Sequence, residues 1–210
     1  MASFGALYAL TFVRPRRAFE ALLAHERALA YSGLATGITA LTYTLVYFFL
    51  AHNGGRPTAF QPWLAIPAEH YYRWNLVLHV PSILLAWVAA AGFTQLAARA
   101  LGGRGSFEHT LSVMGFGISV SSWWTGLHDL VTTFLGFVGV IDQRAYEDAM
   151  SSATPARTLL WLLMGGYLVS FLVLFAKGVG AAHRISATRS VIAGTLGFVV
   201  YQAVFVIFNR

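Results

Sequence analysis

Five long apolar runs dominate the hydrophobic pattern of this chain. An α-helix needs about 20 apolar residues to cross a hydrocarbon core of about 30 Å, and each run is close to that length or longer. We therefore expect an all-α, polytopic membrane protein with five transmembrane helices. The predicted spans are residues 28–51, 76–98, 111–138, 158–176 and 190–208.

The third apolar run continues to residue 141, which is farther than one crossing requires. At a rise of 1.5 Å per residue, a helix over residues 111–141 would be roughly 46 Å long. Such a run must tilt, extend beyond the membrane or break, or else cross twice, and Gly126–Asp129 is the position that most favours a break. In the second span, Pro81 predicts a kink because proline removes a backbone donor from a helix.

The first 27 residues form a segment in front of the membrane domain, which we place at residues 28–210. Its apolar stretch, FGALYALTFV, is too short to span and precedes the arginines, so it does not have the pattern of a secretory signal. The following PRRAFEALLAHERAL places Phe19, Leu22 and Leu23 on one face of a helix. This pattern predicts an interfacial amphipathic helix, with a solvated lead-in helix as the alternative.

Composition agrees with a membrane protein. Hydrophobic residues make up 57% of the chain and charged residues 10%, whereas a soluble domain has about 25% charged residues. The chain has no cysteine. Disulfides, thiol nucleophiles, iron–sulfur clusters and c-type haem attachment are therefore excluded.

Basic residues flank the spans, and their distribution predicts the orientation. With a cytoplasmic N-terminus, nine basic residues lie in inner segments and five in outer segments. The positive-inside rule therefore favours a cytoplasmic N-terminus and an outer C-terminus. The net charge of +6 indicates anionic lipids on the cytoplasmic side as partners, and not nucleic acid. The predicted headgroup contacts are Arg14, Arg16, Arg17, Arg104, Arg184 and Arg189.

A glycine-rich stretch, RALGGRGSFEHTL, separates the second and third spans. It lacks the spacing and the lysine of a phosphate-binding loop, and no strand precedes it. Gly102 and Gly103 suit positive φ angles after a helix, Ser106 is a predicted N-cap, and Glu108 favours the dipole of the next helix. The stretch therefore predicts a membrane hairpin turn.

The same region carries a family resemblance. ALGGRGSFEHTLSVMGFG, preceded by YYRWNLVLHVPSILLAWVAAAGFTQLAARA, resembles bacterial members of the Yip (Ypt/Rab-interacting protein) domain family, and FVRPRRAFEALLA and AKGVGAAHRIS fit as well. Many relatives have a proline where this chain reads SVSSWW. The resemblance implies a five-span membrane protein with a cytoplasmic N-terminus, here in a bacterial inner membrane. Eukaryotic members are associated with Rab GTPases and vesicle traffic. A shared fold does not imply a shared function, so the resemblance implies a fold and not a chemistry.

Ionisable residues near the outer ends of the spans are the candidates for chemistry, because burying them is costly. Imidazole and carboxylate ligands suit zinc or another divalent ion, and two histidines could hold a b-type haem. We favour a structural role, in which aromatic and histidine side chains lie at the interface and Asp129 pairs with Arg73. No cofactor is expected. The metal candidates are Glu69, His70, His79, His128 and Asp129.

Small residues predict close helix packing, either within one bundle or between copies of the chain. The candidate positions are Gly33, Gly37, Gly165, Gly166, Gly194 and Gly197. Without a substantial soluble domain, the chain is predicted to be a non-enzymatic scaffold or accessory subunit that binds lipids or other membrane proteins. A small transporter or channel is the first alternative, and a metal- or haem-binding membrane protein is the second.

Overall fold

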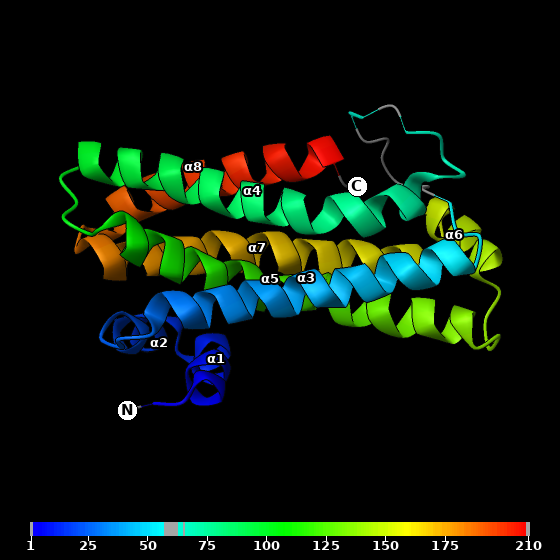
Figure 1. The fold of residues 1–210 in the computed structure, drawn as a ribbon, viewed down its shortest axis with the longest axis horizontal. Coiled ribbons are helices and arrows are strands. Elements are labelled where there is room, and N and C mark those ends of the chain that lie inside the picture. Colours follow the sequence, from blue (N-terminus) through cyan, green and yellow to red (C-terminus); the bar gives the residue numbers. More distant parts are fainter. Residues whose placement is uncertain (1, 57–62, 65, 209–210) are drawn as a thin grey trace.

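The computed structural model describes residues 2–56, 63–64 and 66–208, and the regular elements within them are eight α-helices (Figure 1). The predicted all-α class is confirmed. In chain order the helices are α1 (Phe4–Val13), α2 (Pro15–Leu23), α3 (Ala28–His52), α4 (Tyr71–Ala100), α5 (Phe107–Phe137), α6 (Gln143–Ser151), α7 (Pro155–His183) and α8 (Ala187–Phe208).

The five long helices α3, α4, α5, α7 and α8 lie side by side along the longest axis of the molecule (Figure 1). Helices α1 and α2 lie at one end of this bundle, and α6 lies at the other. Four of the long helices, α3, α4, α7 and α8, are long and apolar enough to cross a membrane. An integral membrane location follows from these helices.

Helix α5 differs from the other four long helices. Its 31 residues include His128, Asp129 and many serines and threonines, and it does not reach the apolarity of the other four. It contacts α3, α4 and α7, and the stretch from Ser112 to Ser122 is buried without interruption. Because neighbouring helices and not lipid surround this stretch, α5 tolerates polar side chains within the bundle.

The chain does not break at Gly126–Asp129, because α5 continues through this stretch as one helix. The third apolar run therefore forms a single helix that passes from one end of the bundle to the other (Figure 1). The polar side chains here bond within the helix: Thr132 donates to the His128 carbonyl at 2.9 Å, and Thr133 to the Asp129 carbonyl at 2.6 Å. Such bonds satisfy side chains without breaking the helix.

The glycine-rich stretch forms the turn between α4 and α5. Gly102 has a φ of +87°, and the Ser106 hydroxyl accepts a bond from the His109 amide at 3.1 Å, so it caps α5. A Cβ on Gly103 would lie 2.7 Å from the Nδ1 atom of His183 at the end of α7. The turn therefore packs tightly against the end of α7, which its glycines allow.

The N-terminal helices are joined to the bundle. Phe19 and Leu22 of α2 are fully buried, and α2 contacts α5 and α7. In α1, the Tyr8 hydroxyl lies 2.7 Å from the Ser119 hydroxyl and accepts a 2.7 Å bond from the Trp123 indole. The apolar face of α2 thus packs on α5 and α7, and the location of this segment at the membrane interface stays a prediction.

Candidate functional site

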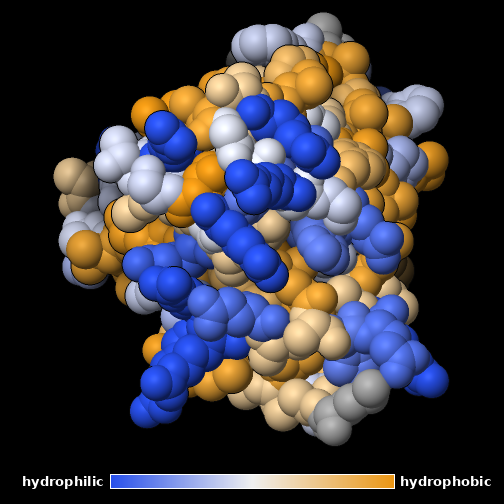
Figure 2. Space-filling view, turned by 90° about the vertical axis from the view of Figure 1, so that its left-hand side faces the viewer, coloured by the Kyte–Doolittle hydropathy of each residue, from blue (hydrophilic) through white to orange (hydrophobic). Residues whose placement is uncertain are grey.

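The two ends of the bundle differ in charge. At the end that holds α2, the α4–α5 turn and the α7–α8 turn, hydrophilic side chains gather on the surface (Figure 2). Nine basic and three acidic residues belong to this end, whereas the described residues of the opposite end include four basic and five acidic ones. The basic residues are Arg14, Arg16, Arg17, Arg27, Arg99, Arg104, Lys177, Arg184 and Arg189. We call this surface the basic end.

Packing of three segments brings the arginines of the basic end together. Phe19 anchors α2 beside Gly178 of α7, where an added Cβ would lie 3.5 Å from its ring. The Arg104 amide donates to the His183 carbonyl at 3.2 Å, which joins the two turns. Arg189 reaches over the α4–α5 turn, 3.6 Å from a Cβ built on Gly102. Segments far apart in the sequence therefore form one surface.

All six arginines predicted to contact headgroups are exposed at the basic end. Arg16 is paired with Glu20 at 3.0 Å, one turn along α2. Arg184 caps α7 with φ 55° and ψ 40°, and is the non-glycine residue with positive φ among those described. A left-handed conformation costs an arginine roughly 1–2 kcal/mol. The sequence keeps a strained arginine where glycine is the usual choice.

A buried polar cluster supports the basic end from within the bundle. The Thr110 hydroxyl donates to Gln95 Oε1 at 2.6 Å and lies 2.8 Å from His183 Nε2. The Gln95 amide in turn donates to the Gly105 carbonyl at 3.0 Å. Sequence reasoning missed this cluster, because its members are single polar residues from three segments that are separated in the sequence.

The metal candidates do not assemble into a metal site. In the described part of the chain, no three histidine, aspartate or glutamate side chains come together to hold an ion. Glu69 and His70 are exposed before α4. His79 is fully buried, with its ring centroid 5.1 Å from that of Tyr47.

Asp129 pairs with its neighbour and not with the predicted arginine. His128 Nδ1 lies 3.0 Å from Asp129 Oδ1. Arg73 is exposed near Glu69 and Arg144, and no ion pair joins it to Asp129 among the described residues. Asp129 and its imidazole partner are therefore adjacent residues of the same helix.

The six glycines predicted to mediate packing divide into two groups. A Cβ on Gly166 would meet the Trp124 ring, one on Gly194 the backbone of α7, and one on Gly197 the side chain of Thr94. These three lie at contacts within the bundle. The others have open space around them, namely Gly33, Gly37 and Gly165.

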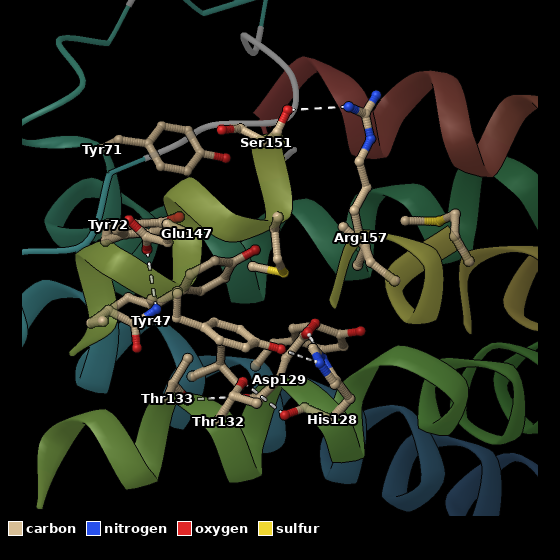
Figure 3. A pocket seen from close by; sticks show the side chains of 18 of the residues that line it. Tyr47, Tyr71, Tyr72, His128, Asp129, Thr132, Thr133, Glu147, Ser151 and Arg157 are labelled. Atoms are coloured by element: carbon tan, nitrogen blue, oxygen red, sulfur yellow. Dashed lines mark hydrogen bonds and ion pairs between the residues drawn. The ribbon is translucent and has the colours of Figure 1, made fainter. Parts of the chain in front are cut away.

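A cavity of about 370 Å³ opens at the end opposite the basic end, between α6 and the long helices (Figure 3). We call it the tyrosine cavity. Sequence reasoning missed it because α6 was not predicted, although the segment QRAYEDAMS has a capping Asp142 before it and an amphipathic pattern. Its aromatic lining consists of Tyr43, Tyr47, Tyr71, Tyr72, Tyr146 and Trp161.

Hydrogen bonds join α6 to the other walls of the tyrosine cavity. His128 Nε2 lies 2.7 Å from the Tyr146 hydroxyl, and burial, together with the charge of Asp129, raises the pKa of Tyr146. Glu147 is buried, and its carboxylate accepts bonds from the Gln143 amide at 3.2 Å and the Arg56 backbone amide at 2.9 Å. The Asp129 side chain remains 31% exposed.

The comparisons with known proteins agree with the fold. No curated protein and no solved structure matches the chain. The Yip1 domain matches residues 9–208, which include α2 to α8 and the second half of α1. A match over nearly the whole chain, together with the all-helical bundle and its apolar helices, shows that the chain belongs to the Yip1 domain family.

Proposed function

We propose that this Yip1-domain protein is a non-catalytic membrane scaffold or accessory subunit, whose basic end binds the anionic headgroups of the cytoplasmic leaflet. One observation carries this proposal: nine basic residues from three separate segments of the chain converge at one end of the bundle, against three acidic ones. Each basic residue near an anionic leaflet contributes about 1 kcal/mol of attraction.

The left-handed backbone of Arg184 supports the proposed binding of anionic headgroups. Backbone strain persists where the surrounding structure fixes it, and it is often found at functional positions. Arg184 directly follows His183, whose carbonyl accepts the bond from the Arg104 amide, and Arg189 extends over the α4–α5 turn. A cluster of three arginines on two joined turns provides a preorganised surface for phosphate oxygens.

The proposal includes an orientation, with the N-terminus in the cytoplasm and the C-terminus outside a bacterial inner membrane. Reporter fusions after Asn53 and Asp148 are expected outside, and fusions after Gly103 and Ala182 inside. An inverted pattern would place the basic end at the outer leaflet and would contradict the proposal.

Lipid binding is tested by changing the charge of one end at a time. The triple variant Arg104→Gln, Arg184→Gln and Arg189→Gln should retain less phosphatidylglycerol in native mass spectrometry, after purification into a mixture with phosphatidylcholine. A matched control, with the glutamine substitutions made at Arg56, Arg73 and Arg144, removes the same charge from the other end. Equal lipid loss in the two variants would refute a specific role of the basic end.

A transporter would be favoured by an unwound helix near the middle of the bundle. Helix α5, which carries the most serines and threonines in its buried part, is continuous from Phe107 to Phe137. The structure therefore gives no specific support to that alternative.

A further inference from the structure

We propose that the tyrosine cavity binds an organic ammonium group, either a water-soluble amine or the headgroup of a lipid. The inference is independent of the proposed function, because it concerns the opposite end of the bundle. The cationic nitrogen of the ligand would lie against tyrosine rings and the Asp129 carboxylate.

The lining supplies the rings that recognise an ammonium ion. The rings of Tyr47 and Tyr72 are stacked with centroids 6.1 Å apart, and Tyr71 meets Tyr72 edge-on at 5.2 Å. Tyr146 on α6 lines the cavity as well. The negative face of an aromatic ring attracts a cation, and a cage of such rings is the recurring device for substituted ammonium groups.

Asp129 supplies the complementary charge. Its Oδ1 atom contacts His128, while the side chain keeps 31% of its surface exposed and lines the cavity. Its charge also acts on Tyr146. The buried Glu147 holds Gln143 and the Arg56 amide, so we assign it to the structure of the wall and not to the ligand.

The chemistry of the wall excludes two other classes of ligand. A divalent metal ion needs several oxygen or nitrogen ligands, and no group of three candidate side chains is present among the described residues. A free anion beside the rings would be repelled by Asp129 and Glu147, since Arg157, a cation of the same lining, lies apart from Asp129 on the other side of the cavity. An organic ammonium ion needs only rings and one carboxylate, and a volume of about 370 Å³ lies within the range of small-molecule sites.

The position of the cavity lets both kinds of source reach it. Asp129 lies 22 residues after the start of α5, which corresponds to about 33 Å along the helix, roughly the thickness of the hydrocarbon core. Arg157 and Ser151 lie apart from Asp129 on the other side of the cavity (Figure 3). Arg157 is exposed and donates one guanidinium N–H to the Ser151 carbonyl at 3.1 Å, so its other N–H groups could contact the phosphate of a headgroup whose ammonium enters the cavity.

Choline is a suitable probe, and its uncharged carbon isostere is the control ligand. The full chain is placed in nanodiscs of phosphatidylglycerol, which carries no amine, and binding is measured by isothermal titration calorimetry. Choline should bind and the isostere should not. Absence of choline binding, or equal binding of the isostere, would overturn the proposal.

Matched variants assign the site. Asp129→Asn keeps an acceptor for His128 and should weaken choline binding at least tenfold, whereas Asp148→Asn, which removes the same charge from the exposed face of α6, should leave it unchanged. Tyr146→Phe keeps the ring and should bind, and Tyr146→Leu should bind several-fold more weakly. If Asp129→Asn does not fold, the choline affinities of Tyr146→Phe and Tyr146→Leu decide whether the cavity is the site. Wild-type affinity in Asp129→Asn, or equal affinity in the two Tyr146 variants, would refute the assignment.

The source of the ammonium group is distinguished by repeating the titration with phosphatidylethanolamine in the nanodisc. Loss of apparent choline affinity would identify the lipid headgroup as the competing ligand. Unchanged affinity would identify a water-soluble amine. Both results support the ammonium site.

Discussion

Replacing Arg184 by glycine should stabilise the fold while weakening its contact with anionic lipid. Arg184 has φ 55° and ψ 40°, a conformation that costs an L-residue roughly 1–2 kcal/mol and glycine almost nothing. Glycine also raises the entropy of the unfolded chain, which removes about 0.5–1 kcal/mol of the gain. The net stabilisation is therefore about 0.5–1 kcal/mol, or a rise of about 1–4 °C in the unfolding midpoint for a chain of this size.

The assay is thermal unfolding in a non-ionic detergent, where no headgroup charge contributes. Arg184→Ala is the matched control, because it removes the same charge but keeps the left-handed strain. Both variants should lose about fivefold in affinity for phosphatidylglycerol, which corresponds to about 1 kcal/mol for one positive charge. An alanine variant as stable as the glycine variant would show that Arg184 is not strained, and unchanged lipid affinity in both would show that it does not contact headgroups.

Further predictions test the packing of the bundle. Gly194→Ala should lower the unfolding midpoint, since its Cβ would lie 2.9 Å from the Ala176 backbone nitrogen, whereas Gly165→Ala, with open space around it, should be neutral or slightly stabilising. Gly103→Ala should destabilise the α4–α5 turn, because the added methyl group meets His183; an unchanged midpoint would show that the turn is loosely packed. Tyr8→Phe should cost about 2 kcal/mol for its two hydrogen bonds. Burial raises the pKa of Tyr8 above its ordinary value of 10.0. The neutral hydroxyl therefore stabilises the fold, and this contribution is lost as the pH rises above 10. The free energy of unfolding of Tyr8→Phe should fall less steeply over that range than that of the wild type.

The long helices and the basic turns could be predicted from the sequence because they follow from local signals. Apolar length marks a helix of membrane width, and the α4–α5 turn carries its glycines and the capping Ser106 in one short stretch. These features depend on neighbours along the chain. The all-helical class and the family follow from them.

The partners of individual side chains could not be predicted, because they depend on the rotation of each helix about its axis. Gly33 and Gly37 have the spacing of a packing motif but face outward, whereas Gly166, which sits beside the outward Gly165, meets Trp124. Neighbouring residues of a helix point about 100° apart around its axis, so one position along the chain separates an outward glycine from one at a helix contact. The contact between His128 and Asp129 likewise depends on side-chain orientation, which the apolar pattern of the third run does not specify.

The polarity of α5 has a consequence for how the chain is made. Helices α3, α4, α7 and α8 are apolar enough to enter the membrane singly, but α5 carries buried serines and threonines that become favourable only beside α3 and α7. We expect α5 to complete its insertion late, together with its neighbours, and not as an isolated segment. Until it does, only an even number of helices has crossed, and the C-terminus remains on the side where the N-terminus lies. The insertion of α5 therefore decides on which side of the membrane the C-terminus lies.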